Sequence, residues 1–154
     1  MYAYVDAFYI YNGIINRTNT VSLSTNRSHL VGISFKGFAI FAGGFTGSAA
    51  SDAIDVFGLN SNGSLARLST ATLTARYNLA AAVAGDRVYF AGGTTDGSTG
   101  LDTVEAFTIS SEGVLSKVDT TFKLSVARHN LSGATLKSGG KEYAVFVGGE
   151  NGSS

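Results

Sequence analysis

Apolar and polar residues alternate in short runs along this chain, and the runs end in glycines or small polar residues. The clearest run is RVYFAGGTTDGSTG, which begins at Arg87, and closely similar runs begin at Phe38 and Tyr143. Alternation with a period of two residues predicts β-strands that bury one face. No segment of useful length has the periodicity of an amphipathic helix. The pattern therefore predicts an all-β protein.

Three sequence features recur with nearly constant spacing. The first is a strand-like quartet, VDAF, IDVF or VEAF, which begins at Val5, Ile54 and Val104. An arginine follows the start of each quartet after 22, 22 and 24 residues, and a Gly-Gly pair follows each arginine after 16, 16 and 20 residues. A fixed order of features with extra residues confined to a loop is typical of a structural repeat. The recurring residues are the quartet acids Asp6, Asp55 and Glu105, the arginines Arg27, Arg76 and Arg128, and the glycine pairs Gly43 and Gly44, Gly92 and Gly93, and Gly148 and Gly149.

Each period contains four candidate strands: a run of small residues (NLAAAVA), two alternating runs (DRVYFAGG and LDTVEAFTI) and a polar, Thr-rich run (SLARLSTATL). Four short antiparallel strands every ~50 residues are the pattern of one β-propeller blade. The innermost strand of a blade has room only for small residues, and Gly32, Ala81 and Gly133 fit that position. We therefore expect one domain over residues 1–154, a β-propeller segment of about three four-stranded antiparallel blades, with repeats at about 5–53, 54–103 and 104–154.

The composition narrows the range of functions. The 154 residues include 11 Lys or Arg and 11 Asp or Glu, so no net field attracts the chain to nucleic acid, and we expect no nucleic-acid binding. No apolar run approaches the ~20 residues of a membrane span, so we expect no membrane insertion. The chain has no cysteine, which removes disulfides, thiolate nucleophiles and cysteine metal sites. The first residues, MYAYVDAFYIYNGI, lack the basic region of a signal peptide, and the sequence does not indicate a compartment.

The order of the recurring features resembles the kelch repeat. An arginine stands before a small-residue strand, an aromatic strand ends in Gly-Gly, and a polar loop leads to a quartet such as IDVF. The resemblance covers essentially the whole chain and implies a propeller fold. The chain departs from the family because it has no tryptophan, and because Phe8, Phe57 and Phe107 stand where typical copies have tyrosine. It is similar in this to the divergent kelch-like arrays of proteins from bacteria and their viruses.

The three arginines are the best-placed candidates for ligand binding. Each is expected at the mouth of an innermost strand, where the arginines and the nearby His29, Tyr77 and His129 would form a ring of donors at one rim of the central shaft. Such a ring suits an acidic peptide, a sulfated or carboxylated sugar, or a phosphate. In kelch proteins that bind peptides, residues at this rim often contact the partner, so the resemblance implies the same here. His29 and His129 are expected at equivalent places.

The alternative interpretation of the arginines is structural. Each arginine would bond to carbonyls or carboxylates of the adjacent blade, with the quartet acids as candidate partners, and would hold the ring together. The quartet acids recur at one position of the repeat, as such pairing requires. The sequence does not decide between the two interpretations.

Nothing in the sequence points to catalysis. An active site requires a cluster of acids, bases or a nucleophile, and none stands out. The copper oxidases that share the kelch propeller need a cysteine linked to a tyrosine, and this chain has no cysteine. Two histidines alone do not make a metal site, and the glycine pairs lack the lysine and helix of a phosphate loop. We expect no enzyme activity, no cofactor and no metal.

The order of the strands predicts an incomplete ring. The chain is expected to begin on the third strand of one blade and to end after the second strand of another, whereas propellers of this repeat length close with about six or seven blades. Two copies joined head to tail would give a six-bladed dimer, or the rest of a longer chain would supply the missing blades. The expected function is a non-enzymatic binding or structural module, whose partner is itself, another protein, or an anionic peptide or glycan. The alternative is a lectin-like propeller that holds sugar at residues such as Tyr77 and Phe45, and an enzyme would need chemistry from further sequence.

Overall fold

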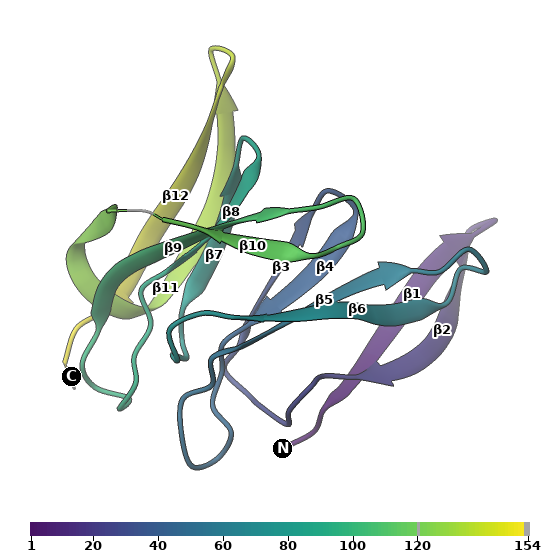
Figure 1. The fold of residues 1–154 in the computed structure, drawn as a ribbon, viewed down its shortest axis with the longest axis horizontal. Helices are drawn as coiled ribbons and strands as arrows, with labels where there is room; N and C mark the ends of the chain where they lie inside the picture. Colours follow the sequence, from purple (N-terminus) through teal and green to yellow (C-terminus); the bar gives the residue numbers. More distant parts are fainter. Residues whose placement is uncertain (120, 153–154) are drawn as a thin grey trace.

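The computed structural model describes residues 1–119 and 121–152, and every regular element in them is a β-strand (Figure 1). Short alternating segments separated by glycine-containing turns favour antiparallel hairpins. No helix with the length and apolar character of a membrane span occurs among the described residues. The strands are β1 (Tyr4–Tyr11), β2 (Ile14–Ser22), β3 (Val31–Phe35), β4 (Phe38–Ala42), β5 (Ala53–Leu59), β6 (Leu65–Thr72), β7 (Ala80–Ala84), β8 (Arg87–Ala91), β9 (Leu101–Ile109), β10 (Leu115–Val118), β11 (Lys123–Ser138) and β12 (Lys141–Glu150).

The strands form three antiparallel sheets. The first contains β1 and β2, and the second has four strands in the order β3-β4-β5-β6. In the third sheet β7, β8, β9 and β10 follow one another in the same way, and two more strands join because the first residues of β11 pair with β9 while the rest pair with β12. Figure 1 shows the sheets side by side, from the purple β1–β2 hairpin at one end to the yellow β12 at the other.

The two four-stranded arrays, β3–β6 and β7–β10, use the same register at equivalent residues. Phe41 of β4 lies opposite Asp55 of β5, and Phe90 of β8 lies opposite Glu105 of β9. The sequence explains this agreement, because a Gly-Gly pair follows β4 and β8 and a quartet lies within β5 and β9. The sequence repeat is therefore also a repeat of strand pairing.

The main hydrophobic core joins these two arrays. Ile40 and Ile54 of the first array and Phe90 and Phe107 of the second are almost completely buried and belong to one cluster. Removal of this apolar surface from water is the main force that holds one array against the other.

The first strands of successive repeats approach one another closely. β7 contacts both β3 and β11, and the Thr135 hydroxyl of β11 donates to the carbonyl of Val83 at 2.8 Å. A Cβ atom at Gly133 would lie 2.2 Å from the carbonyl oxygen of Ala81. Backbone cannot rotate away from such a contact as a side chain can, so only glycine fits there. Gly133, one of the small residues expected on the first strands, thus serves this close packing.

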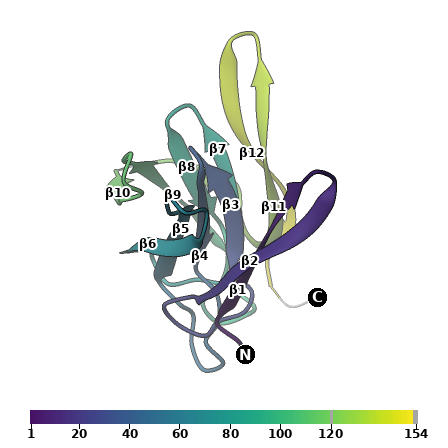
Figure 2. The same cartoon turned by 90° about the vertical axis from the view of Figure 1, so that its right-hand side faces the viewer.

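The prediction of an all-β fold with antiparallel sheets is confirmed. The sheets are open, and the β1–β2 and β11–β12 hairpins lie at opposite ends of the molecule in Figure 1. Figure 2 shows the β11–β12 hairpin projecting beyond the neighbouring strands. The further prediction of about three propeller blades also requires that these open sheets are arranged around an axis, and it remains a proposal.

Candidate functional site

Three connections carry the arginines and lead into the first strand of a repeat. The first comprises residues 23–30, between β2 and β3, and the second comprises residues 73–79, between β6 and β7. The third comprises residues 124–131 and lies within β11. All three contain one residue with left-handed backbone, at His29 (φ 55°), Asn78 (55°) and Asn130 (56°), so the chain bends at the same place in each.

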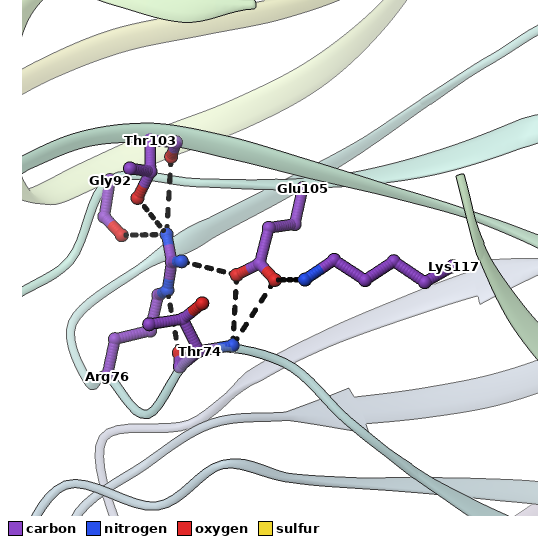
Figure 3. A network of polar contacts seen from close by, with 6 residues as sticks. All are labelled: Thr74, Arg76, Gly92, Thr103, Glu105 and Lys117. Carbon is purple, nitrogen blue, oxygen red and sulfur yellow. Dashed lines mark hydrogen bonds and ion pairs between the residues drawn. The ribbon is translucent and has the colours of Figure 1, made fainter. Parts of the chain in front are cut away.

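In the second connection, Arg76 is buried in a closed network of polar contacts (Figure 3). Its side chain is 0% exposed, and one terminal nitrogen contacts the carboxylate of Glu105. The other terminal nitrogen donates to the carbonyls of Gly92 and Thr103 at 3.2 Å and to the Thr103 hydroxyl at 2.8 Å, and Nε donates to the carbonyl of Thr74 at 3.0 Å. Every guanidinium nitrogen therefore has a partner inside the protein, and a ligand would not reach it in this conformation.

The first connection contains an equivalent ion pair. The side chains of Arg27 and Asp55 are both 0% exposed, and their charged atoms lie 2.8 Å apart. Arg27 also donates to the carbonyl of Phe41 at 3.2 Å, and the backbone N–H of Ser24 donates to both oxygens of Asp55 at 3.1 Å. Arg27 and Arg76 thus pair with quartet acids, as the structural interpretation expects, but each pair joins a connection to the array that it enters and not to the adjacent one. Ligand binding at the rim stays a prediction.

The carboxylates of Asp55 and Glu105 each contact a second cation, which the sequence analysis missed. Lys117 on β10 contacts Glu105, and Arg67 on β6 lies 3.7 Å from Asp55. Arg17 on β2 contacts the acidic residue of the first quartet. These cations stand 12 or 13 residues after the first residue of their quartets. That spacing within the polar, Thr-rich runs is the signal that would have identified them.

The network around Arg76 shifts the pKa of both buried charges. Burial raises the pKa of Glu105, but Lys117, Arg76 and the backbone N–H of Thr74 stabilise the carboxylate more strongly, so its pKa lies below its ordinary value. Burial lowers the pKa of the Arg76 guanidinium, and the charge of Glu105 opposes this effect. An arginine remains charged at neutral pH even so. The network is therefore an ion pair that ties the second connection to β9.

The third connection lacks the matching ion pair. Arg128 has no carboxylate partner among the described residues, and its terminal nitrogen donates to the carbonyl of Phe146 at 3.3 Å. Its Nε has no hydrogen-bond partner in the described part of the chain. Asp6, the acidic residue of the first quartet, lies on β1 with its side chain 44% exposed and contacts Arg17. The pairing of arginine with quartet acid thus forms twice, and Arg128 and Asp6 do not meet within the chain.

Equivalent residues of the three connections lie next to one another. The backbone N–H of Asn78 donates to the carbonyl of His29 at 3.0 Å, and the N–H of Asn130 donates to the carbonyl of Asn78 at 2.9 Å. His29 is therefore equivalent to Asn78 and Asn130, and His129 occupies the place of Tyr77. The expectation that the two histidines are equivalent is wrong by one residue, because only the third connection has its histidine directly after the arginine.

His129 lies inside its connection. It is 3% exposed, and its Nε2 is 3.6 Å from the carboxylate of Glu150, which also accepts a hydrogen bond from the Asn130 side chain at 2.7 Å. Within residues 1–119 and 121–152 there is no group of three or more His, Asp or Glu side chains placed to hold a metal ion. The contacts of His129 are therefore internal, unlike those of the exposed His29.

An aromatic group, His29, Phe45 and Tyr77, lies beside the first two connections. The ring centroid of Tyr77 is 5.1 Å from that of Phe45 and 6.2 Å from that of His29. Phe45 and Tyr77 are partly exposed. The fold thus brings together residues that the sequence analysis assigned separately to anion binding and to sugar binding.

The turn that follows Thr94 packs against this aromatic group. Asp96 accepts hydrogen bonds from the backbone N–H groups of Ser98 at 2.8 Å and Thr99 at 2.7 Å, and these hold the pKa of Asp96 well below its usual range. A Cβ atom at Gly97 would lie 2.7 Å from the hydroxyl oxygen of Tyr77. The turn therefore contacts Tyr77 and carries a permanent negative charge at neutral pH.

Comparison with known proteins does not assign this chain to a family. No protein-family model matches the sequence, and a search of curated proteins finds no match. The resemblance to the kelch repeat therefore stays a prediction from the sequence, and the function is inferred from the geometry described above.

Proposed function

We propose that this chain is a segment of a kelch-like β-propeller that acts as a binding or structural module without catalysis. In this proposal β3–β6 and β7–β10 are two blades, and the β1–β2 and β11–β12 hairpins are halves of others. A second copy or the rest of a longer chain completes the ring. The observation that carries the proposal is the series of hydrogen bonds between equivalent residues, from Asn78 to His29 and from Asn130 to Asn78.

The packing of the first strands supports this arrangement. Blades converge on a central axis, so equivalent residues of their inner strands meet and small residues are required there. The backbone contact of Gly133 with Ala81 and the contacts of β7 with β3 and β11 are of this kind. A face-to-face sandwich of two sheets would instead bury alternating side chains across a gap of about 10 Å.

The aromatic group is the ligand surface in this proposal. Arg27 and Arg76 hold the connections from inside, so contact with a ligand falls to the exposed His29 and the partly exposed Tyr77. An imidazole donor suits a carboxylate or sulfate group, as in an acidic peptide or a sulfated sugar, and His29 is the main contact in this proposal because the negatively charged turn at Asp96 lies against Tyr77. The two arginines then contribute by fixing the positions of these donors.

The contact between Phe45 and Tyr77 favours a second candidate function, a lectin-like propeller. Two partly exposed rings with centroids 5.1 Å apart offer an apolar platform, and the Tyr77 hydroxyl offers a polar contact at its edge. An aromatic body with a polar tip suits a ligand that has both apolar and hydroxyl-bearing faces. A neutral sugar is such a ligand.

Titration calorimetry with an acidic peptide, a sulfated disaccharide and neutral monosaccharides separates the two functions. Binding of the anionic ligands is expected, and His29→Ala should weaken it roughly fivefold to tenfold, the value of one hydrogen bond. A lectin would instead bind the neutral sugars and lose binding in Tyr77→Ala. Tyr2→Ala, at an 80% exposed tyrosine outside the connections, is the matched control. Absence of binding by every ligand class would contradict a binding role for the aromatic group.

A further inference from the structure

The third ion pair of the repeat is divided between the two ends of the molecule. Arg128 lies in the β11–β12 half and Asp6 lies in the β1–β2 half, and Figure 1 places these halves at opposite ends. The side chain of Asp6 is 44% exposed, compared with 0% for Asp55 and 8% for Glu105. The β11–β12 hairpin therefore has the arginine, and the β1–β2 hairpin the acid, of an ion pair whose equivalents are buried in the two complete arrays.

An aromatic pair is divided in the same way. In both complete arrays the phenylalanine two residues before the Gly-Gly pair contacts the quartet phenylalanine edge to face, with ring centroids 5.9 and 5.8 Å apart. The third pair would be Phe146 of β12 with Phe8 of β1. Phe8 is 63% exposed, whereas the equivalent Phe57 and Phe107 are 0% and 1% exposed. Phe8 thus lacks the packing that its equivalents have.

Gly148 has free space beside it where the equivalent glycines contact the next arginine-bearing connection. At the equivalent Gly43 and Gly92, a Cβ atom would lie 2.5 and 2.6 Å from the carbonyl oxygen of the arginine in the following connection. The second glycine of each pair donates its N–H to that same oxygen at 2.9 and 3.0 Å. At Gly148 no described atom lies within 4 Å of such a Cβ. A third hydrogen bond of this series would run from the N–H of Gly149 to the carbonyl of Arg27, since Arg27 is the arginine that neither Gly44 nor Gly93 contacts in this way.

We propose that a second copy of this chain supplies the missing members, so that β12 of each copy pairs with β1 of the other and two copies close a ring of six four-stranded sheets. Arg128 then pairs with the partner's Asp6, Phe146 packs on the partner's Phe8, and the partner's Arg27 covers Gly148. The strand register follows from β4–β5 and β8–β9 and sets Phe146 opposite the partner's Asp6. The ring rests on the proposed function for the placement of sheets around an axis, while the pairing rests on the contacts themselves.

The divided contacts favour a second copy over an unrelated partner. Each edge offers what the other lacks: a cation for an acid, an N–H donor for a carbonyl, and exposed apolar side chains on both sides. Val147 is 64% exposed although the equivalent Ala42 and Ala91 are 0% exposed. Head-to-tail pairing of two copies uses the β1 edge and the β12 edge once each and leaves neither of these two edges open to aggregation.

Native mass spectrometry and sedimentation of the 154-residue chain test this ring. The expected species at micromolar concentration has twice the 15.9 kDa mass of one chain. Arg128→Asp sets two carboxylates opposite each other at both junctions, and Asp6→Arg sets two cations there. Each variant alone should dissociate about a hundredfold more readily, because like charges in a close interface repel strongly.

A mixture of the two variants provides the decisive measurement. When Arg128→Asp and Asp6→Arg chains pair with each other, both junctions again hold opposite charges, so a mixed dimer is expected where neither variant forms one alone. Isotopic labelling of one variant identifies this dimer by mass. Lys141→Asp and Asp86→Arg make the same changes of charge elsewhere and should leave the wild-type dimer intact. Gly148→Asn, which tolerates left-handed backbone but fills the free space, should also weaken the dimer.

Three results overturn the ring: a wild-type mass of one chain, a mass of three or more chains, or a dimer that both charge reversals leave intact. Circular dichroism of each variant confirms that loss of the dimer is not loss of the fold. A single chain that still binds a ligand at the aromatic group would overturn the ring and leave the proposed function standing. A dimer that binds no ligand of either class would support the ring and overturn the ligand-binding role of the aromatic group.

Discussion

Arg76 and Glu105 bring opposite charges into the interior, and their neighbours compensate both. Transfer of each ion from water costs several kcal/mol, which is offset only where hydrogen bonds satisfy all of its polar atoms. The guanidinium has a partner at each nitrogen, and the carboxylate receives hydrogen bonds from Lys117 and from the backbone of Thr74. Removal of Glu105 would leave Arg76 buried without a counterion, and removal of Arg76 would leave Glu105 with Lys117 alone. The need of a buried guanidinium for a counterion is common to Arg76 and Arg27 and explains why the two complete repeats use the same pairing at the same register, although Nε of Arg27 has no partner among the described residues.

The lowered pKa of Glu105 predicts how its contribution changes with pH. A carboxylate whose pKa is lower in the folded than in the unfolded chain stabilises the fold above the unfolded pKa, and this stabilisation is lost as the pH falls through the folded pKa. Wild type should therefore exceed Glu105→Gln in free energy of unfolding at neutral pH, and the difference should shrink as the pH falls below the ordinary pKa of a glutamate. Urea denaturation of both proteins across this range measures it. Asp86→Asn, a change at an exposed turn, should stay close to wild type throughout, and a difference for Glu105→Gln that grows on acidification would contradict the prediction.

Among the strands, the first strands of the repeats, β3, β7 and β11, set the distance between successive repeats. β11 approaches β7 so closely that Gly133 faces backbone, whereas Gly32 on β3 faces the side chain of Phe41, with a Cβ-to-ring distance of 2.9 Å. A ring at the end of a side chain can shift by a few tenths of an ångström, but a strand in a paired sheet cannot do so alone. Equivalent glycines in different repeats thus carry unequal constraints.

Alanine at these two glycines should therefore have unequal costs. Gly133→Ala forces β11 away from β7 and should lower the free energy of unfolding by about 3 kcal/mol, the upper range for overpacking. Gly32→Ala requires only a shift of the Phe41 ring and should cost about 1 kcal/mol. Neither glycine has left-handed backbone, so backbone strain is matched between the variants. Equal losses in chemical denaturation would show that the backbone contact does not fix the spacing of β7 and β11.

The whole molecule has two complete arrays between two hairpins that lack counterparts. Exposed apolar residues gather on these hairpins, with Phe8 at 63% and Val147 at 64% exposure, while their equivalents in the complete arrays are buried. Burial of such side chains stabilises by roughly 1.5–3 kcal/mol each, so closure of the open arrays would add substantially to the stability of the chain. Stability and assembly are coupled in the ring proposed here.

This coupling predicts that the thermal midpoint depends on protein concentration. Association stabilises the folded chain by mass action, so a tenfold rise in concentration should raise the midpoint of wild type by roughly 2 °C. Arg128→Asp, which is expected to remain a single chain, should show no such rise. Differential scanning calorimetry over two decades of concentration measures both. A midpoint of wild type that does not move with concentration would contradict coupled folding and association.

The sequence by itself determined the strands and their repetition. Alternation of apolar residues and the glycine-rich turns act locally, so strand positions and the all-β class follow from them. The recurring arginines and acids also gave pairing of arginine with quartet acid as one of two interpretations, without saying which acid each arginine meets. A choice between them required burial, because a surface arginine and an interior arginine have the same sequence spacing.

Only the tertiary structure decided which residues meet across repeats. The aromatic group of His29, Phe45 and Tyr77, the crowding at Gly133 and the separation of Arg128 from Asp6 all depend on how one repeat lies against the next. That placement results from contacts between residues that lie far apart in the sequence, from 32 positions for Phe45 and Tyr77 to 52 for Ala81 and Gly133, and these contacts leave no mark in local periodicity. The repeat and its incomplete ends were therefore visible in the chain, whereas the contacts that these ends lack became visible only when the buried equivalents of the same residues could be compared with them.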